Sequence, residues 1–253
     1  MPKPLNDTAK LVAAILASGA FAAGAADAAH ATVAGTSSEL LSATGRVRSG
    51  LAPFADPARI TNSWLPLSVH REAVLLGDDD GHAVRTVRTR LGHTWRFRLP
   101  DQAIRAAVIE DQSYRDGALR STVRSYFAQA DDGTVYRIAA EIDRYDATGS
   151  RSPARDLTSI EGRTDRTLTV AMPATPRDGQ RFWSTPSNTA AGLTRVIDTN
   201  ARLTVPIGSF NRVLVVHATP TAGGASEVRY YARGTGLIKQ QRASGAVELA
   251  SLS

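Results

Sequence analysis

The 253-residue sequence contains no cysteine. This absence excludes disulfide bonds, thiolate metal ligands, a cysteine nucleophile and a lipid-modified cysteine for this chain. Stability must therefore come from packing alone. The roughly 220 residues that follow the N-terminal segment are enough to bury one sizeable hydrophobic core.

Lysine is almost as scarce, since only three of the 30 basic residues are lysine. The formal net charge of +6 suits an anionic partner, and the forked guanidinium of arginine suits phosphate or carboxylate groups. A genome-wide preference for arginine accounts for the same bias without any function. Nucleic acid is not a predicted partner, because Trp95 and Phe97 alternate with Arg96 and Arg98 and so occupy the opposite face of a strand.

Long apolar runs are missing except near the start of the chain. Residues 1–28 have the pattern of a signal peptide: Lys3 and Lys10, an apolar run over residues 11–26, and A-x-A cleavage sites at 26–28 and 29–31. The run is rich in Ala and Gly and shorter than the ~20 residues that cross a bilayer, so we do not expect an integral membrane protein. We expect an exported protein, either periplasmic or secreted.

The composition changes twice along the remaining chain. Residues 29–57 are rich in Ala, Ser, Thr, Gly and Pro, which are poor material for a core, and this range is predicted to be a flexible linker. Large side chains begin with Asn62–Leu67. Residues 58–253 are therefore predicted to form a single β domain.

Hairpin signals dominate that domain. Apolar and polar residues alternate over 104–114, 118–129 and 134–145, and Asp-Gly turns at 116–117 and 132–133 separate these runs. No helical periodicity is sustained over three turns. The pattern predicts an all-β, mainly antiparallel fold, in which a hairpin meander forms a curved sheet or a partly open barrel.

Other runs extend this prediction. Glu72–Leu76 and Ala83–Arg90 flank a turn over residues 77–81, and residues 156–160 are expected to pair with residues 167–172 after a polar loop at 148–153. Val213–Val216 is apolar on both faces, which indicates a strand covered on both sides. In the run 118–129, one face carries Leu119, Ser121, Val123, Ser125 and Phe127.

Five short motifs carry a resemblance to known proteins. They are W-L-P-L at 64–67, Y-F-A-Q-A-D-D-G-T-V-Y at 126–136, M-P-A-T-P-R-D-G-Q at 172–180, V-P-x-G-x-F at 205–210 and Y-Y-A-x-G-x-G-L-I at 230–238. In this order they resemble a family of uncharacterised exported bacterial β-rich proteins. The resemblance implies a fold and an export route but no catalytic residue. Some members of that family carry a lipid-anchoring cysteine, which this chain lacks.

No catalytic or metal motif is recognisable. No serine lies in G-x-S-x-G, no histidines have H-x-H or H-E-x-x-H spacing, and the acidic run at 78–80 lacks the spacing of an EF-hand. Gly234–Gly236 does not have the pattern of a dinucleotide loop. Neither a catalytic residue, a metal nor a cofactor is predicted, although a catalytic triad assembled only by the fold stays open.

Three functional hypotheses remain. The first is a non-enzymatic exported β domain that binds a lipid or another apolar or amphiphilic small molecule, or an envelope protein. Its predicted ligand-binding residues are Trp95, Phe97, Phe127, Tyr136 and Tyr230. The second is a cell-envelope hydrolase. The third is attachment to anionic glycan or lipid phosphate, with Arg120, Arg124, Arg229 and Arg233 as the predicted anion-binding residues.

Overall fold

The computed structural model describes residues 52–98, 102–156, 168–184, 192–219 and 225–253, all of which fall in one unit of the chain, residues 41–253. Every regular element in these ranges is a β-strand. No helix within them is long and apolar enough to cross a membrane. The predicted signal peptide and most of the predicted linker lie outside the described residues.

Thirteen strands follow one another along the chain. They are β1 Glu72–Asp79, β2 His82–Arg98, β3 Ala103–Arg115, β4 Ala118–Gln129, β5 Val135–Tyr145, β6 Arg151–Asp156, β7 Thr169–Met172, β8 Arg181–Trp183, β9 Leu193–Val205, β10 Gly208–Ala218, β11 Glu227–Ala232, β12 Gly236–Arg242 and β13 Gly245–Leu252.

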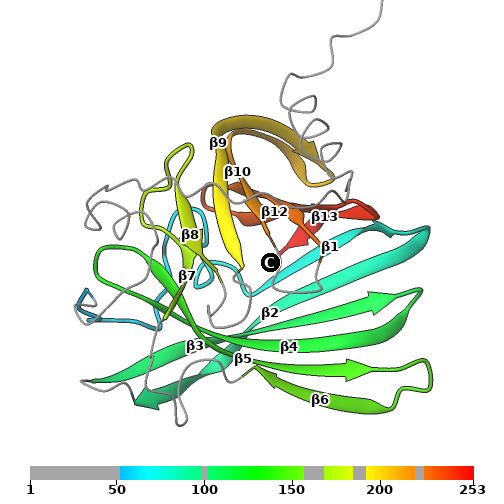
Figure 1. The fold of residues 1–253 in the computed structure, drawn as a ribbon, viewed down its shortest axis with the longest axis horizontal. Coiled ribbons are helices and arrows are strands. Elements are labelled where there is room, and N and C mark those ends of the chain that lie inside the picture. Colours follow the sequence, from blue (N-terminus) through cyan, green and yellow to red (C-terminus); the bar gives the residue numbers. More distant parts are fainter. Residues whose placement is uncertain (1–51, 99–101, 157–167, 185–191, 220–224) are drawn as a thin grey trace, which may run out of the picture. The chain divides into compact units, whose positions relative to one another are not determined.

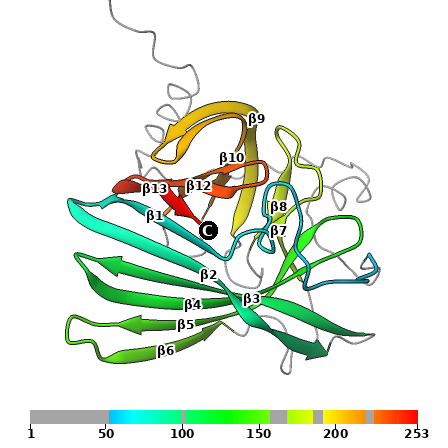
Figure 2. The ribbon, with the colours of Figure 1, turned by 180° about the vertical axis from the view of Figure 1, so that it is seen from behind.

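These strands form one antiparallel sheet, which is curved and does not close into a barrel (Figure 1). Strands β1 to β6 pair in chain order and make a first meander, and strands β8 to β13 make a second meander in the same way. The two meanders meet where β1 pairs with β13, as Figure 2 shows from behind. The short strand β7 belongs to neither meander and pairs with β5. The structure thus confirms the all-β, mainly antiparallel fold class and the curved sheet.

Two hairpin turns show why Asp-Gly is a reliable signal. Asp80 and Gly81 have φ of 57° and 76°, and Asp116 and Gly117 have φ of 51° and 79°. Positive φ at both central residues gives the backbone twist that two antiparallel strands need, and Asp and Gly tolerate it. The first turn is tighter than the predicted range 77–81, because β1 continues to Asp79.

The chain between β5 and β7 departs from its prediction. Strand β6 lies partly in the range expected to be a loop, and both β6 and β7 pair with β5. Most of the run 156–160, which is expected to pair with residues 167–172, lies outside the described residues. The Asp146 side chain accepts hydrogen bonds from the backbone N–H of Thr148 and of Ser150 at 2.8 and 2.9 Å. This Asx turn reverses the chain directly after β5, so β6 runs back antiparallel to β5.

The hydrophobic core joins the sheet to the segment that precedes it. Ile60, Trp64 and Leu65 are buried in one cluster with residues of β3, β5 and β10. The run Val213–Val216 is at most 2% exposed, which confirms that it is covered on both faces. Within the range predicted to be a linker, the ring of Phe54 packs against Tyr136 with centroids 6.0 Å apart.

Asn62 holds this N-terminal segment in place. Its amide nitrogen donates to the carbonyl oxygens of Gly133 and Pro173 at 2.9 and 3.1 Å. Its side-chain oxygen accepts from the backbone N–H groups of Trp64 and Leu65 at 2.9 and 3.1 Å. One buried amide therefore joins the segment to the β4–β5 turn and to the residue that follows β7.

Candidate functional site

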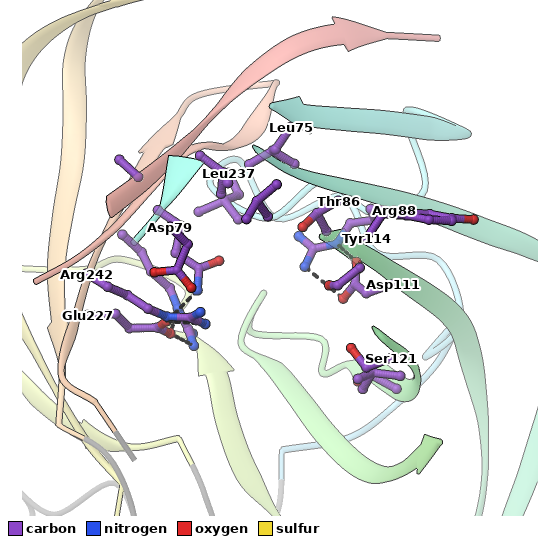
Figure 3. A pocket seen from close by; sticks show the side chains of 18 of the residues that line it. Leu75, Asp79, Thr86, Arg88, Asp111, Tyr114, Ser121, Glu227, Leu237 and Arg242 are labelled. Carbon is purple, nitrogen blue, oxygen red and sulfur yellow. Dashed lines mark hydrogen bonds and ion pairs between the residues drawn. The ribbon is translucent and has the colours of Figure 1, made fainter. Parts of the chain in front are cut away.

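A cavity of about 890 Å³ lies between the two meanders. Its walls come mainly from β1 to β4 of the first meander and from β11 to β13 of the second (Figure 3). Ligand pockets in proteins usually occupy about 300–1,000 Å³, so this space is of ligand size.

Strand alternation decides which side chains reach the cavity. On β4, Ser121, Val123, Ser125 and Phe127 line it, and these residues belong to the row that alternation predicts on one face. Of the alternate residues, Arg124 and Tyr126 do not line it, but Arg120 does, next to the shift in the β3–β4 register. The inner face of β4 is therefore mixed, with hydroxyl groups beside apolar groups.

Much of the apolar lining lies at one end of the strands, whereas Val84, Ala246 and Val247 line the cavity nearer the β1–β2 turn. Leu65 and Leu67 of the N-terminal segment, Phe127 of β4 and Leu237 of β12 contribute to it. The segment reaches this end because the Gly234 N–H of the β11–β12 turn donates to the Ser63 carbonyl oxygen at 2.8 Å. Leu65 is 7% exposed, and Leu67, Phe127 and Leu237 are partly buried against the core.

The charged part of the lining contains two groups of ion pairs. In the first, Arg88 of β2 donates through Nε and Nη2 to the two carboxylate oxygens of Asp111 of β3, at 2.8 and 3.0 Å. Burial opposes the charge of Arg88, but the adjacent Asp111 carboxylate outweighs it and keeps the pKa of Arg88 above its ordinary value. Such a two-pronged pair is held in one geometry.

The second group is centred on Glu227 of β11, which is 8% exposed. Its carboxylate accepts hydrogen bonds from Arg229, Gln240 and Arg242, the last at 3.3 Å. Burial alone would raise the pKa of Glu227, but the charges of Arg229 and Arg242 and the hydrogen bonds from Arg229 and Gln240 hold it below its ordinary value. Glu227 is thus an ionised group within the wall, and it neutralises part of the charge of two arginines.

Two further lining arginines have no such counter-ion. The guanidinium groups of Arg115, at the end of β3, and Arg120, near the start of β4, make no hydrogen bond or ion pair with any residue that the structure describes. Arg115 acts only at a distance, on the neighbouring Asp116, whose pKa is lowered chiefly by its hydrogen bond with His82. Both guanidinium groups are available to a bound anion.

The predicted ligand-binding residues are distributed over several places. Only Phe127 lines the cavity. Phe97, Tyr136 and Tyr230 are buried in the fold and do not line it. Trp95 is 54% exposed and packs at 6.2 Å from the ring of Tyr126, which is not a lining residue.

The four predicted anion-binding arginines are also separated. Arg120 and Arg229 line the cavity. Arg124 instead donates to Glu110 at 2.7 Å, and the Arg233 guanidinium lies 4.3 Å from the centre of the Trp64 ring. The structure therefore does not bring the four together in one surface patch.

The histidines do not form a catalytic centre with serine in the described part of the chain. His82 Nδ1 lies 2.6 Å from Asp116 Oδ2 at an exposed turn, and His70 Nε2 lies 2.9 Å from the Gly234 carbonyl oxygen. Among the described residues, no histidine is hydrogen-bonded to a serine hydroxyl, and no group of acidic residues and histidines could hold a metal ion.

Sequence reasoning misses the pairs that build the charged wall. Arg88, Asp111, Glu227 and Arg242 are not among the predicted site residues, although Arg88 and Asp111 lie directly opposite in the β2–β3 register. The pair depends on the register of β2 against β3, which the Asp-Gly turn at 116–117 does not set, because that turn joins β3 to β4. The Glu227–Arg242 pair depends on the β11–β12 hairpin in the same way.

Comparison of the chain with known protein families, with characterised proteins and with solved structures found no match.

Proposed function

We propose that this protein is an exported β domain that binds one small amphiphilic molecule in the cavity between its two meanders. The observation that carries the proposal is the cavity itself, about 890 Å³ with an apolar and a charged part. Export is proposed from the signal-peptide pattern of residues 1–28.

The lining supports a ligand that is partly apolar and partly anionic. Leu65, Leu67, Phe127 and Leu237 offer an apolar surface on which a hydrocarbon chain would gain about 25 cal/mol for each Å² of apolar area removed from water. Six arginines and four acidic residues also line the cavity, which leaves an excess of positive charge. An uncharged oil would leave this polar surface without partners, and a fully polar solute would leave the apolar surface uncovered.

The position of the histidines supports a binding role rather than a hydrolytic one. No described histidine lines the cavity, and the lining serines, such as Ser121 and Ser125, have no hydrogen-bonded base among the described residues. A serine hydroxyl needs an adjacent base to become a nucleophile. The serines of the wall are therefore suited to donate hydrogen bonds.

The test is uptake of a fluorescent fatty acid by the purified, delipidated protein, together with mass spectrometry of any lipid that co-purifies. We expect saturable binding of one molecule per chain. The variant V123W places a large ring in the middle of the cavity wall and should weaken uptake at least about tenfold, which is about 1.4 kcal/mol of binding free energy.

L76W is the matched control, since Leu76 lies next to the lining residue Leu75 but is 46% exposed and does not line the cavity. It should bind as the unaltered protein does. No uptake by the unaltered protein and no co-purifying lipid, or equal binding by V123W and L76W, would overturn the proposal.

A further inference from the structure

The lining of the cavity is polarised along the strands. Arg242 pairs with Gly245, Asp79 pairs with both Gly245 and His82, and Arg115 pairs with Ala118, so these residues occupy one end of the sheet. We call it the turn end, because the β1–β2, β3–β4 and β12–β13 turns lie there. The apolar residues Phe127 and Leu237 lie toward the opposite end, six residues from Ser121 and five from Arg242, or roughly 17–20 Å at ~3.3 Å per residue.

The turn end is also the more accessible to water. Asp78 and Arg242 are exposed there, whereas Leu65 at the opposite end is 7% exposed. An amphiphile in this cavity therefore meets water and several charges at the turn end, and mainly apolar groups beside Arg137, which lies opposite Phe127, at the other. Its head group belongs at the turn end, and its hydrocarbon chain extends inward.

Most charges of the wall are already matched by protein partners. Arg88 is held by Asp111, and Arg229 and Arg242 are held by Glu227. Arg137 donates to the Ser184 carbonyl oxygen at 3.4 Å. Asp78 and Asp79 line the β1 side of the turn end, where they accept hydrogen bonds from the Gly81 N–H and the Ser244 hydroxyl. An anion is repelled by these two carboxylates and does not gain from the arginines that are already paired.

The remaining place for an anion is the β3–β4 side of the turn end. Arg115 and Arg120 line the cavity there without an ion-pair partner among the described residues. Ser113 and Ser121, which lie directly opposite each other on β3 and β4, line it as well and make no side-chain hydrogen bond with a described residue. Two forked guanidinium groups beside two hydroxyl donors match the oxygens of a carboxylate or a phosphate.

Resting on the proposed function, we infer that Arg115 and Arg120, assisted by Ser113 and Ser121, bind the acidic head group of a single-chain amphiphile whose hydrocarbon chain lies toward Phe127 and Leu237. The wall thereby orients the ligand, with the head at the turn end and the chain inside. Its chemical class is a fatty acid or a monoalkyl phosphate.

The test compares three ligands of one chain length: a fatty acid, a monoalkyl phosphate and a primary alcohol. Each displaces a fluorescent fatty acid from the unaltered protein and from the double variant R115Q/R120Q. We expect the unaltered protein to bind at least one of the two acids about tenfold or more tightly than the alcohol, because only the acids gain charge-assisted hydrogen bonds from the two guanidinium groups. Whichever acid binds more tightly identifies the head group.

In R115Q/R120Q this preference should disappear while binding of the alcohol stays unchanged. The control R181Q/R202Q removes the same charge from two exposed arginines of β8 and β9 that do not line the cavity, and it should keep the preference. S113A/S121A keeps both guanidinium groups and should weaken the preference only in part. Thermal unfolding of each variant verifies that it is folded.

The outcomes separate the two proposals. If the unaltered protein binds the alcohol as tightly as both acids, or if R115Q/R120Q keeps the preference, the head-group site is wrong while the cavity remains a binding site. If none of the three ligands displaces the probe, and the probe itself does not bind, the proposed function fails as well.

Discussion

Arg88 and Asp111 lie directly opposite each other on β2 and β3 and are joined by two hydrogen bonds of 2.8 and 3.0 Å within the cavity wall. Their side chains are 28% and 22% exposed, so water screens the pair only in part. Removing one partner leaves a partly buried charge without compensation, which is usually more costly than removing both.

D111N is expected to lower the free energy of unfolding by about 1–3 kcal/mol, because Arg88 loses its counter-ion. The double variant R88M/D111L should cost less than the sum of the variants R88M and D111L, since it removes both charges. Chemical denaturation of the unaltered protein and of these variants measures the coupling. Simple additivity within about 0.5 kcal/mol would show that the pair contributes no mutual stabilisation.

Glu227 should control part of the acid sensitivity of the fold. Its pKa is below the ordinary value of 4.5 despite the opposing effect of burial, because Arg229 and Arg242 favour the ionised form. A carboxyl whose pKa is depressed on folding stabilises the protein above its unfolded pKa, and this contribution is lost as the pH falls through the folded pKa.

The free energy of unfolding of the unaltered protein should therefore decrease as the pH falls from about 5 through the folded pKa. E227Q should be less stable at pH 7 and should lose less stability over the same acidic range. Urea titrations at several pH values test this. Parallel pH profiles for the two proteins would mean that Glu227 titrates alike in the folded and unfolded states.

Substitution of Asn62 should lower the free energy of unfolding more than substitution of most other polar residues. It is 5% exposed and its side chain makes hydrogen bonds with Gly133, Pro173, Trp64 and Leu65. N62A leaves these buried backbone groups without partners, and we expect a loss of about 2–4 kcal/mol in the free energy of unfolding. T61A, at the exposed neighbour, should change it by no more than about 0.5 kcal/mol, and a similar effect of both variants would contradict the role given to Asn62.

Gly77 is required by the close approach of β1 and β13. A Cβ at this position would lie 1.9 Å from the Ala246 carbonyl oxygen, so G77A must displace backbone at the junction of the two meanders. We expect destabilisation of about 1–3 kcal/mol, measured by thermal and chemical unfolding.

The matched control for G77A is G92A. A Cβ added at Gly92 would have no atom within 4 Å, and the residue has no positive φ, so the methyl group of alanine meets open space. This variant should be neutral or stabilised by about 0.4–1 kcal/mol, because alanine restricts the unfolded chain. Equal destabilisation by G77A and G92A would contradict the close approach as the cause.

Local sequence patterns predict most of the hairpins of the fold. The Asp-Gly turns at 80–81 and 116–117 and the strict alternation of β4 specify hairpins and faces, because both signals act between neighbours in the chain. The β1–β13 pairing could not be predicted, since no local pattern specifies which distant strand covers an edge. The same long-range pairing creates the second wall of the cavity.

The candidate site is less accessible to sequence reasoning. The predicted ligand contacts are aromatic residues, but Phe97, Tyr136 and Tyr230 lie in the buried interior because of packing that residue type alone does not reveal. Phe127, Arg120 and Arg229 are the predicted residues that reach the cavity. Whether an arginine of the cavity wall has a counter-ion depends on the cross-strand register. Arg88 lies opposite the carboxylate of Asp111, whereas Arg120 has no carboxylate opposite it.

The β1–β13 junction also sets the order in which the molecule can assemble. The Arg71 N–H donates to the Ser253 carbonyl oxygen at 2.7 Å, and Ala73 faces Leu252, so β1 finds one of its two neighbours in β13, the most distant described strand in the sequence. Contacts between such distant positions form late and slow the search for the native state. The wall of the cavity is consequently incomplete until β13 has joined the sheet beside β1.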